Sequence, residues 1–483
     1  MTTEAEERQE KLNWFIKNKI APYAYQFDQK HHADTIVNNF TRYDNQEVKV
    51  AGRLMKIRGH GKASFADLMD GSGKIQLFTA VDQVSEKDFE IWNHLDRGDI
   101  VGIEGTVFKT QRGEITIKVR NLQLLSKCVN PLPDTWFGVK DEEIKYRQRY
   151  MDLIINPDSK KVFLTRSKMI SLMRKFLEER GFIELETPLL QTIYGGASAT
   201  PFMTHCEALN RDLYLSIAPE LFLKRYVVGG YERVYEITKK FRNEGIDKFH
   251  NPEHMSLEWY QAYADYNDGM ELVEELFKYL AKKLFGKASI TYQGNKIDFG
   301  KKWKRMPLLE AVKEYTGVDV SDITTDEEAR DVARQQGIDA SKVTKGNIAD
   351  ELMKTFRHKL IQPTFLMDYP IELAPLAKPK RGDPTKAEIF QPFVAGMEIA
   401  RAYSELNDPF IQEQHFKEQE NEREAGNIEA HPTDKDFVNA LKFALPPTCG
   451  VGFGIERMTM LFADQATIRD VIAFPIMREE NSA

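Results

Sequence analysis

The alternation of apolar and polar positions along the chain predicts two kinds of structure in its first quarter. Residues 6–20 carry Leu12, Phe15 and Ile16 at helical spacing, which predicts an amphipathic helix with these three on one side. From Val48 to about Lys127 the pattern becomes short runs of two-residue alternation, which is typical of strands. The clearest runs are Val48–Val50, Ile75–Phe78, Ile100–Gly105 and Ile115–Val119, with turn sequences at Asp70–Gly73 and Arg112–Glu114. About five short strands in fewer than about 100 residues predict a small closed barrel of the OB type.

The pattern changes again after Pro131-Leu132-Pro133, which reads as a linker. Lys168–Arg180 carry apolar residues at helical spacing, and Gly181 is placed to end that helix. Arg233–Ile237 and Glu253–Tyr263 are typical of strands that flank a polar loop, and residues from about 305 to 360 indicate an inserted helical module. The predicted organisation is a helical extension (1–46), the barrel (47–130), a linker (131–145) and a larger domain (146–483).

Composition narrows the class of protein without deciding it. A chain of 483 residues is long enough for two or three domains. Its net charge of −7 argues mildly against a nucleic-acid partner but does not exclude one, because binding depends on local patches. Its three cysteines lie far apart without metal-ligand spacing, no apolar run is long enough to cross a bilayer, and the charged start has no signal-peptide pattern. We therefore expect a reduced cytoplasmic protein with no membrane segment.

Two arginines carry the strongest chemical signal. Arg242 lies in Phe241-Arg242-Asn243-Glu244-Gly245, and Arg457 follows the alternating glycines Gly450, Gly452 and Gly454. A guanidinium is a planar, permanently charged group that matches phosphate oxygens in a bidentate way. Glycines allow a ligand to approach the backbone closely, and the apolar helix predicted after Arg457 would begin with its positive end toward an anion. Each segment alone is weak evidence, since such glycines usually make turns and such arginines usually lie in solvent.

Together with other segments, these motifs resemble those of the class II aminoacyl-tRNA synthetases, and most closely the bacterial-type lysyl-tRNA synthetases. The resemblance extends over nearly the whole chain. It is carried by the two arginine segments and by Gly181–Pro188, Ala218-Pro219-Glu220-Leu221, Tyr263–Tyr266 and Tyr403–Pro409. It implies an α+β protein: an N-terminal OB-fold anticodon-binding barrel, then a class II synthetase domain built on a mostly antiparallel sheet flanked by helices.

The resemblance also implies an activity. L-lysine reacts with ATP to give lysyl-adenylate and pyrophosphate, and the lysine is then transferred to the 3′-terminal adenosine of tRNA(Lys). The implied substrates and partners are ATP, L-lysine, tRNA(Lys) and Mg²⁺, and the implied assembly is a homodimer with the Gly181–Pro188 motif at its interface. The substrate supplies its own nucleophile, so the site needs positioning and charge stabilisation rather than a Ser-His-Asp arrangement.

The resemblance assigns roles to residues throughout the chain. The residues implied in catalysis are Arg242, Glu244 and Arg457. The residues implied in ATP binding are Arg242, Glu244, His250, Asn251, His254, Gly454 and Arg457. The residues implied in lysine binding are Gly196, Glu220, Glu258, Tyr260, Arg401, Tyr403 and Glu405. The residues implied in Mg²⁺ binding are Gln391, Glu398 and Glu405. The residues implied in reading the anticodon are Arg58, Phe65, Gln76 and Glu114.

The residue types suit these roles, although each has an ordinary alternative. A desolvated ammonium needs an anionic or hydroxyl partner, so a pocket with several carboxylates favours lysine and repels aspartate. The alternative is that these acids are surface residues. In the barrel an aromatic ring beside polar groups is how OB-folds read single-stranded bases. The alternative there is that Phe65 belongs to the barrel core and Arg58 is merely solvated.

Five positions depart from the family's pattern, two of them being Phe249 and Thr200, where arginine is frequent. His254 stands where a phenylalanine that stacks on adenine is usual, and imidazole offers less stacking area. Gln391 stands where a Mg²⁺-binding glutamate is common, and a neutral amide brings no charge to a metal. Arg401 replaces an asparagine near the substrate carboxylate, which it could bind, or it could oppose the substrate ammonium.

Two other functions stay open on the sequence. One is a synthetase paralogue that activates lysine or an analogue for an acceptor other than tRNA, which the barrel argues against. The other is a non-catalytic protein that keeps the fold, which the two arginines argue against.

Overall fold

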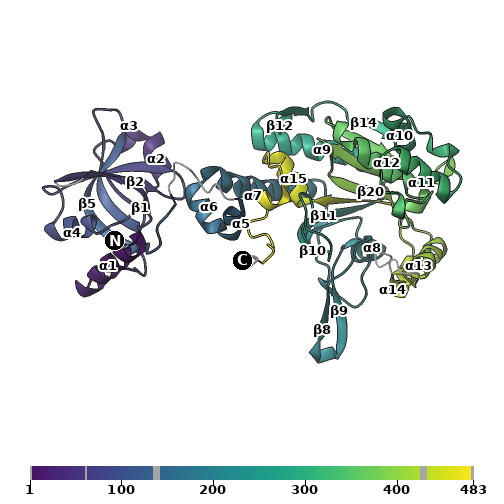
Figure 1. Cartoon of the computed structure of the whole chain (residues 1–483), viewed down its shortest axis with the longest axis horizontal. Coiled ribbons are helices and arrows are strands. Elements are labelled where there is room, and N and C mark those ends of the chain that lie inside the picture. The colour runs from purple at the N-terminus through teal and green to yellow at the C-terminus, as the bar shows by residue number, and fades with distance from the viewer. Residues whose placement is uncertain (1–2, 60–61, 134–141, 425–431, 480–483) are drawn as a thin grey trace. The chain divides into compact units, whose positions relative to one another are not determined.

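The computed structural model describes residues 3–59, 62–133, 142–424 and 432–479, and it divides into two compact units. The first unit is Met1–Val139 and the second is Lys140–Ala483 (Figure 1). Residues 134–141 of the predicted linker lie outside the described residues. The predicted domain bounds stay predictions.

The first unit is a closed five-stranded barrel with the strand order β1-β2-β3-β5-β4. Its strands are β1 (Glu47–Arg58), β2 (Ala63–Met69), β3 (Lys74–Ala80), β4 (Ile100–Lys109) and β5 (Ile115–Ser126). Its helices are α1 (Glu4–Lys17), α2 (Ala33–Asn38), α3 (Phe40–Tyr43) and α4 (Glu86–Asn93). Alternate strand residues such as Val50, Leu77 and Ile117 are fully buried inside, as two-residue periodicity requires. The predicted OB-type barrel is confirmed.

The N-terminal helix differs slightly from its prediction. It begins at Glu4 because Thr3 and Glu6 form a capping box, and it ends at Lys17. Phe15 is buried in the barrel core, whereas Ile16 is 58% exposed. The predicted apolar side is therefore only partly buried, since Leu12 is half-buried and Ile16 lies in solvent.

The second unit is built on a nine-stranded sheet. Its strand order is β14-β15-β18-β20-β21-β11-β10-β6, and β19 pairs with β18. The pairs β6–β10 and β14–β15 are parallel and the others are antiparallel, so the predicted mostly antiparallel sheet is confirmed. The bounds are β6 (Ile183–Glu184), β10 (Arg233–Phe241), β11 (Glu253–Ala262), β14 (Lys304–Pro307), β15 (Thr364–Met367), β18 (Ile389–Val394), β19 (Met397–Glu398), β20 (Ala400–Ser404) and β21 (Thr448–Gly454).

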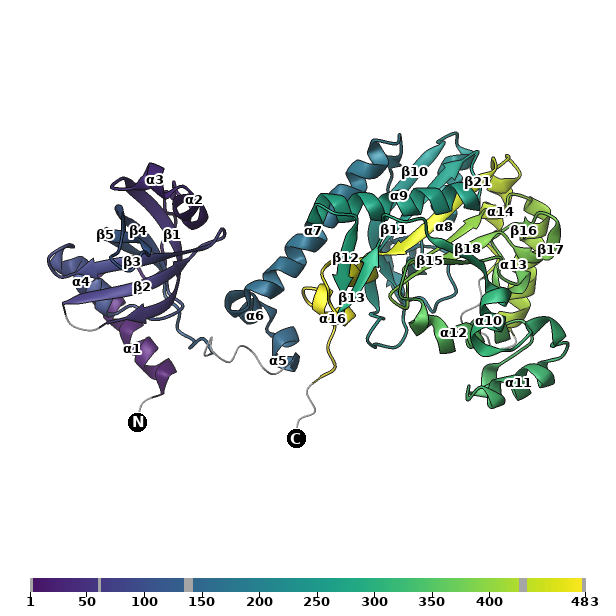
Figure 2. The same cartoon turned by 90° about the horizontal axis from the view of Figure 1, so that it is seen from above.

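Alternation in the central strands separates a packed face from an open face. Leu257, Trp259, Val451 and Phe453 belong to one large apolar core, and each such side chain stabilises the fold by about 1.5–3 kcal/mol. This face is covered by α7 (Pro157–Glu178), α9 (Tyr266–Phe285) and α15 (Ile455–Phe462), and Figure 2 shows α7 and α9 beside each other there. The intervening residues on the other face are polar or glycine, and this open face holds the candidate site.

The remaining elements surround this sheet. Near its ends lie α5 (Glu142–Arg147), α6 (Arg149–Ile155), β7 (Leu190–Gln191), β8 (Met203–Cys206), β9 (Arg211–Leu215), α8 (Glu220–Val228), β12 (Ser289–Tyr292) and β13 (Asn295–Asp298). A second apolar core lies among α10 (Leu308–Thr316), α11 (Asp326–Gln335) and α12 (Ile348–Phe356). The others are β16 (Pro379–Lys380), β17 (Asp383–Ala387), α13 (Pro409–Glu424), α14 (Lys435–Leu441) and α16 (Ile468–Val471). Within the described ranges, every helix is too short or too polar to cross a bilayer.

Candidate active site

The open face of the sheet carries a pocket with a cavity volume of about 320 Å³. This is within the usual range for sites that bind small molecules. Its floor is β21, where Gly450, Gly452 and Gly454 alternate toward the pocket between β11 and β20. Gly450 pairs with Tyr260 and Tyr403, Gly452 with Glu258 and Arg401, and Gly454 with Ser256. At about 3.3 Å per residue, the Gly450 end and the Gly454 end of the floor are about 13 Å apart.

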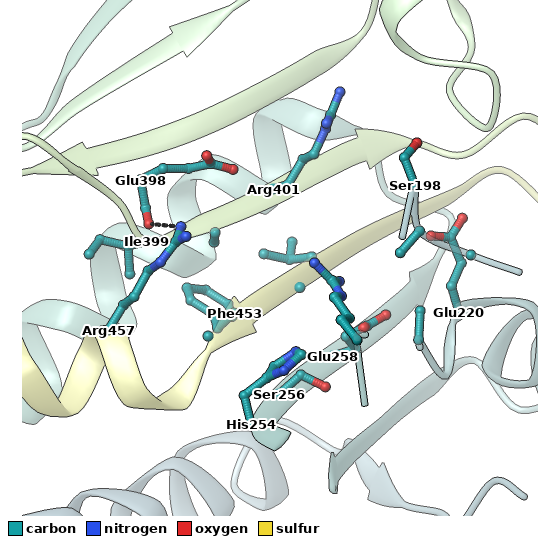
Figure 3. Close-up of a pocket in the computed structure, with 18 of the residues that line it drawn as sticks. Ser198, Glu220, His254, Ser256, Glu258, Glu398, Ile399, Arg401, Phe453 and Arg457 are labelled. Atoms are coloured by element: carbon teal, nitrogen blue, oxygen red, sulfur yellow. Dashed lines mark hydrogen bonds between the residues drawn. The ribbon is translucent and has the colours of Figure 1, made fainter. Parts of the chain in front are cut away.

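The two arginines predicted to bind phosphate line the pocket, with Arg457 next to its Gly454 end, and Glu244 and Glu398 line it as well. Arg457 is the third residue after this N-cap glycine, in the first turn of α15, and its Nη1 donates to the Glu398 backbone carbonyl at 2.8 Å (Figure 3). Its Nη2 lies 3.2 Å from His250 Nε2, and His250 Nδ1 lies 2.8 Å from Asp247 Oδ2. These contacts leave the positive charge of Arg457 without a carboxylate partner among the described residues. Such a guanidinium is prepared for an anionic ligand.

Arg242 lines the same cavity from the end of β10. Its Nε has no hydrogen-bond partner among the described residues. Burial lowers the pKa of the Arg242 guanidinium, and the Glu244 and Glu258 carboxylates partly oppose that shift. A buried arginine with a free donor is a second site for an anion.

His254 lies on β11 between these arginines and carries no charge near neutral pH. Burial lowers the pKa of its imidazole to about 3, and the charges of Arg242 and Arg457 contribute to the shift. A neutral imidazole can stack on a nucleotide base and adds no further positive charge beside the two guanidinium groups.

The Gly450 end is acidic. Glu220 at the start of α8, Glu258 on β11 and Glu405 just after β20 all line the pocket (Figure 3 labels the first two). The Tyr260 hydroxyl donates to Glu258 Oε2 at 3.1 Å. Burial raises the pKa of Glu258 to about 8, and the nearby Glu220 carboxylate adds to that shift. Burial likewise raises the pKa of Glu405 to about 8, although Lys224 opposes the shift.

Glycines make room for this acidic end. A Cβ atom at Gly450 would lie 2.1 Å from Glu405 Oε1 and 2.4 Å from Tyr260 Cε1. A Cβ at Gly196 would lie 3.0 Å from Glu220 Cβ, and Gly196 also has a φ of +86°, which disfavours other residues. These glycines therefore leave space for neighbouring side chains of the protein. The sequence had predicted only that they let a ligand approach the backbone closely.

Arg401 lines the pocket but is fixed to one wall. Its Nη2 donates to the Leu373 carbonyl at 2.8 Å, and its guanidinium carbon lies 5.8 Å from the centre of the Tyr403 ring. Its Nε has no partner among the described residues. The sequence left two roles open for Arg401, which were to bind the substrate carboxylate or to oppose the substrate ammonium. The free Nε can donate to an anion such as a carboxylate, and the positive charge is held beside Tyr403.

The predicted metal ligands do not form a cluster. Gln391 is buried on β18, accepts a hydrogen bond from the Tyr369 hydroxyl and is not among the residues that line the pocket. Glu405 is in ion-pair contact with Lys224. The described residues contain no group of three or more His, Cys, Asp or Glu side chains arranged to hold a metal. Glu398, which lines the pocket beside Arg457, is the predicted ligand that best fits a cation carried by phosphate oxygens.

The barrel of the first unit presents its own predicted site on its outer surface. Arg58 pairs with Phe65 across β1 and β2, and Gln76 on β3 accepts a hydrogen bond from Thr116 at 2.9 Å. Glu114 is exposed and comes just before β5, two residues before Thr116. Phe65 is half-buried outside the barrel core, and Arg58 donates to Asp67 at 2.6 Å. Phe65 therefore lies outside the barrel core, and the Arg58 side chain is ion-paired but 45% exposed; the anticodon role of these residues stays a prediction.

The structure thus brings together, in one pocket, every residue predicted for catalysis, ATP and lysine, while Gln391 lies outside it. Three residues were missed. Lys224 has its fully buried ammonium between Glu220 and Glu405, and its spacing of four from Glu220 was the available signal. In the barrel, Phe78 and Phe108 extend the aromatic surface, with ring centres 4.9 Å from Phe65 to Phe78 and 6.3 Å from Phe78 to Phe108.

Comparisons with known proteins agree with this geometry. Residues 141–478 match the family described as tRNA synthetases class II (D, K and N), and residues 48–125 match the OB-fold nucleic acid binding domain. The chain belongs to the class II tRNA synthetases of the D, K and N group. Its predicted fold class, an α+β chain with an OB barrel before a class II domain, is confirmed.

Full-length relatives narrow the class further. The chain is 49% identical over 480 residues to the lysine–tRNA ligase of Thermoanaerobacter pseudethanolicus, covering 98% of this chain and 96% of the relative. It is 49% identical over 473 residues to the lysine–tRNA ligase of Moorella thermoacetica, covering 98% and 97%. It is 48% identical over 475 residues to that of Pelotomaculum thermopropionicum, covering 98% and 94%.

Proposed function

We propose that this protein is a lysine–tRNA ligase. It activates L-lysine with ATP to lysyl-adenylate and pyrophosphate, and then transfers lysine to the 3′-terminal adenosine of tRNA(Lys). The observation that carries this proposal is the polarity of the pocket floor. Arginines stand at its Gly454 end and three buried or half-buried carboxylates at its Gly450 end, so triphosphate and a doubly ammonium-bearing amino acid fit in one orientation.

Arg242 and Arg457 perform the positioning in the first reaction. The lysine carboxylate oxygen attacks the α-phosphorus of ATP, the bond to the bridging oxygen of pyrophosphate breaks, and pyrophosphate leaves. Arg242 stabilises the charge that develops on the α-phosphate oxygens, and Arg457 holds the γ-phosphate. Glu244, His250, Asn251, His254 and Gly454 bind the rest of the nucleotide. The chain supplies no nucleophile, so orientation and electrostatics account for the rate.

The acidic end selects the amino acid. Glu220 and Glu258 bind the α-ammonium, where the small Gly196 leaves space, and Glu405 with Tyr260 binds the ε-ammonium. Tyr403 forms a wall of this end, and the Nε of Arg401, which has no hydrogen-bond partner among the described residues, would donate to the substrate carboxylate. Neither Glu405 oxygen accepts a well-oriented hydrogen bond from the described residues, which leaves acceptors for an ammonium.

Mg²⁺ fits this site as a companion of ATP. Glu398 would hold it together with the phosphate oxygens, whereas Gln391 and Glu405 are engaged with Tyr369 and Lys224. When bound, the ion neutralises phosphate charge.

The barrel and the sheet edge support the predicted partners. Arg58, Phe65, Gln76 and Glu114 on the outer face of the barrel would bind the tRNA anticodon, with the aromatic ring stacking on a base. In the second unit, Ile183 on the edge strand β6 is 48% exposed, which suits a homodimer interface in the Gly181–Pro188 motif. The cytoplasmic location stays a prediction.

ATP–pyrophosphate exchange against each of the 20 amino acids tests the proposal. Lysine alone should support exchange, and tRNA(Lys) should then accept labelled lysine. Exchange with another amino acid, or none, would refute the function. Exchange with lysine but no charging of tRNA would point to an enzyme for a different acceptor.

A further inference from the structure

Lys224 is a fully buried lysine at the acidic end of the pocket. It lies on α8 one turn after Glu220, and its Nζ donates to Glu220 Oε1 at 2.7 Å. The same ammonium is in ion-pair contact with Glu405 Oε2 and lies 5.9 Å from the ring centre of Phe437 on α14. A single internal cation thus connects two carboxylates that line the pocket, although Lys224 itself is not a lining residue.

The charges at this end balance only when Lys224 is counted. Glu220, Glu258 and Glu405 can carry three negative charges. Of the other buried cations, Lys240 lies 3.7 Å from Glu236, so that pair cancels, and Arg242 and Arg401 are assigned to the phosphate and to the substrate carboxylate. With Lys224 the acidic end has a net charge of −2 when fully ionised, which matches the two ammonium groups of lysine. Without it, three carboxylates would face two ammonium groups, and the excess charge would be buried at high cost.

We propose that Lys224 is a positioning residue for lysine selection. It holds Glu220 and Glu405 together and supplies an internal positive charge that offsets their negative charge beside the substrate ammonium groups. This inference rests on the proposed function, because it takes lysine as the amino acid in the pocket. It adds a role for a residue that would not touch the substrate.

The groups around Lys224 restrict what can titrate here. The titratable neighbours are Glu220 on α8, Glu258 and Tyr260 on β11, Tyr403 and Glu405 on and after β20, and Cys449 on β21. Burial raises the pKa of Tyr260 well above its ordinary value, that of Tyr403 to about 12, and that of the Cys449 thiol well above its ordinary value. Burial lowers the pKa of Lys224, but Glu220 and Glu405 outweigh it and raise that pKa. Glu258 and Glu405 are therefore the groups in this set that change charge near neutral pH.

Lys224→Gln is the decisive variant, because glutamine can still donate hydrogen bonds to both carboxylates but carries no charge. ATP–pyrophosphate exchange is measured from pH 6 to 9 at saturating ATP for the wild type and for this variant. We expect the KM for lysine at pH 7 to rise about 10- to 150-fold, the loss of one charged hydrogen bond, with a smaller change in kcat. We also expect the limb on which KM falls with rising pH to move to higher pH, because the carboxylates lose their internal cation.

Two further variants separate charge from packing. Lys224→Arg keeps the charge, so its pH limb should stay near that of the wild type even if its KM rises. Lys224→Ala should regain lysine affinity when ethylammonium is added, because the small cation can occupy the vacated space. Two results would overturn the inference while wild-type exchange with lysine stands. One is an unchanged lysine KM in Lys224→Gln. The other is a lysine KM in Lys224→Gln that is raised equally at every pH, together with no rescue of Lys224→Ala by ethylammonium. If Lys224→Gln does not fold, the Ala variant with and without ethylammonium decides. A wild type inactive with lysine would instead refute the proposed function.

Discussion

Replacing Gly450 with alanine tests whether the pocket floor sets the position of the acidic end. The added methyl would lie 2.1 Å from Glu405 Oε1 and 2.4 Å from Tyr260 Cε1. Non-bonded heavy atoms prefer about 3.5–4.0 Å, so both side chains must move by about 1 Å or more. Tyr260 packs in an apolar core and Glu405 is also buried, so this movement is resisted by their surroundings.

The expected cost appears mainly in lysine binding. A displaced Glu405 loses its charged hydrogen bond to the substrate ammonium, which is about 1.5–3 kcal/mol, or roughly a 10- to 150-fold rise in lysine KM. Overpacking should also lower the free energy of unfolding by about 1–3 kcal/mol. The KM for ATP should change little, because the arginines lie about 13 Å away along β21.

Steady-state ATP–pyrophosphate exchange measures both KM values, and urea denaturation measures stability. The matched control is Gly346→Ala, where the new Cβ would be 3.8 Å from Glu372 Cβ and Thr344 Oγ1, an ordinary contact away from the pocket. A Gly450→Ala protein that binds lysine as tightly as the wild type would refute the assignment of Glu405 and Tyr260 to the amino acid.

Three other predictions follow from the same geometry. Arg457→Gln should reduce lysine-dependent pyrophosphate exchange about 10²- to 10³-fold with a circular dichroism spectrum like that of the wild type, and unchanged exchange would contradict its phosphate role. Burial raises the pKa of Glu258 from 4.5 to about 8, so the stability that protonated Glu258 contributes is complete below pH 4.5 and is lost as pH rises through 8. Urea unfolding should therefore show that Glu258→Gln gains stability relative to the wild type between pH 5 and 8. A difference in stability that stays constant over this pH range would contradict the pKa shift. Phe65→Ala should raise the KM for tRNA(Lys) in charging about 5- to 150-fold while exchange without tRNA is unchanged, and equal charging by both proteins would remove the ring from the anticodon site.

The surroundings of the side chains give a physical account of three residues that depart from the family's pattern. Gln391 is bonded to Tyr369 inside the sheet, so its neutral amide suits a packing position. His254 is neutral between two arginines, and its charge state could not be read from the motif because Arg242 and Arg457 lie far away in sequence. Arg401 is held by the Leu373 carbonyl, a partner that local sequence does not indicate.

The sequence by itself determined the features that repeat locally. Two-residue alternation located the barrel strands, β10 and β11, and the motifs around Arg242 and Arg457 predicted phosphate binding. Such patterns survive in the sequence because the face on which a side chain lies depends only on the backbone around it. The tertiary structure decided which of these faces meet. The pairing of β11, β20 and β21 places Tyr260, Tyr403 and Gly450 side by side although they are far apart along the chain. Burial of Lys224 between two acids likewise depends on how α8 packs against the end of β20, because a lysine at that spacing on an isolated helix would lie in water.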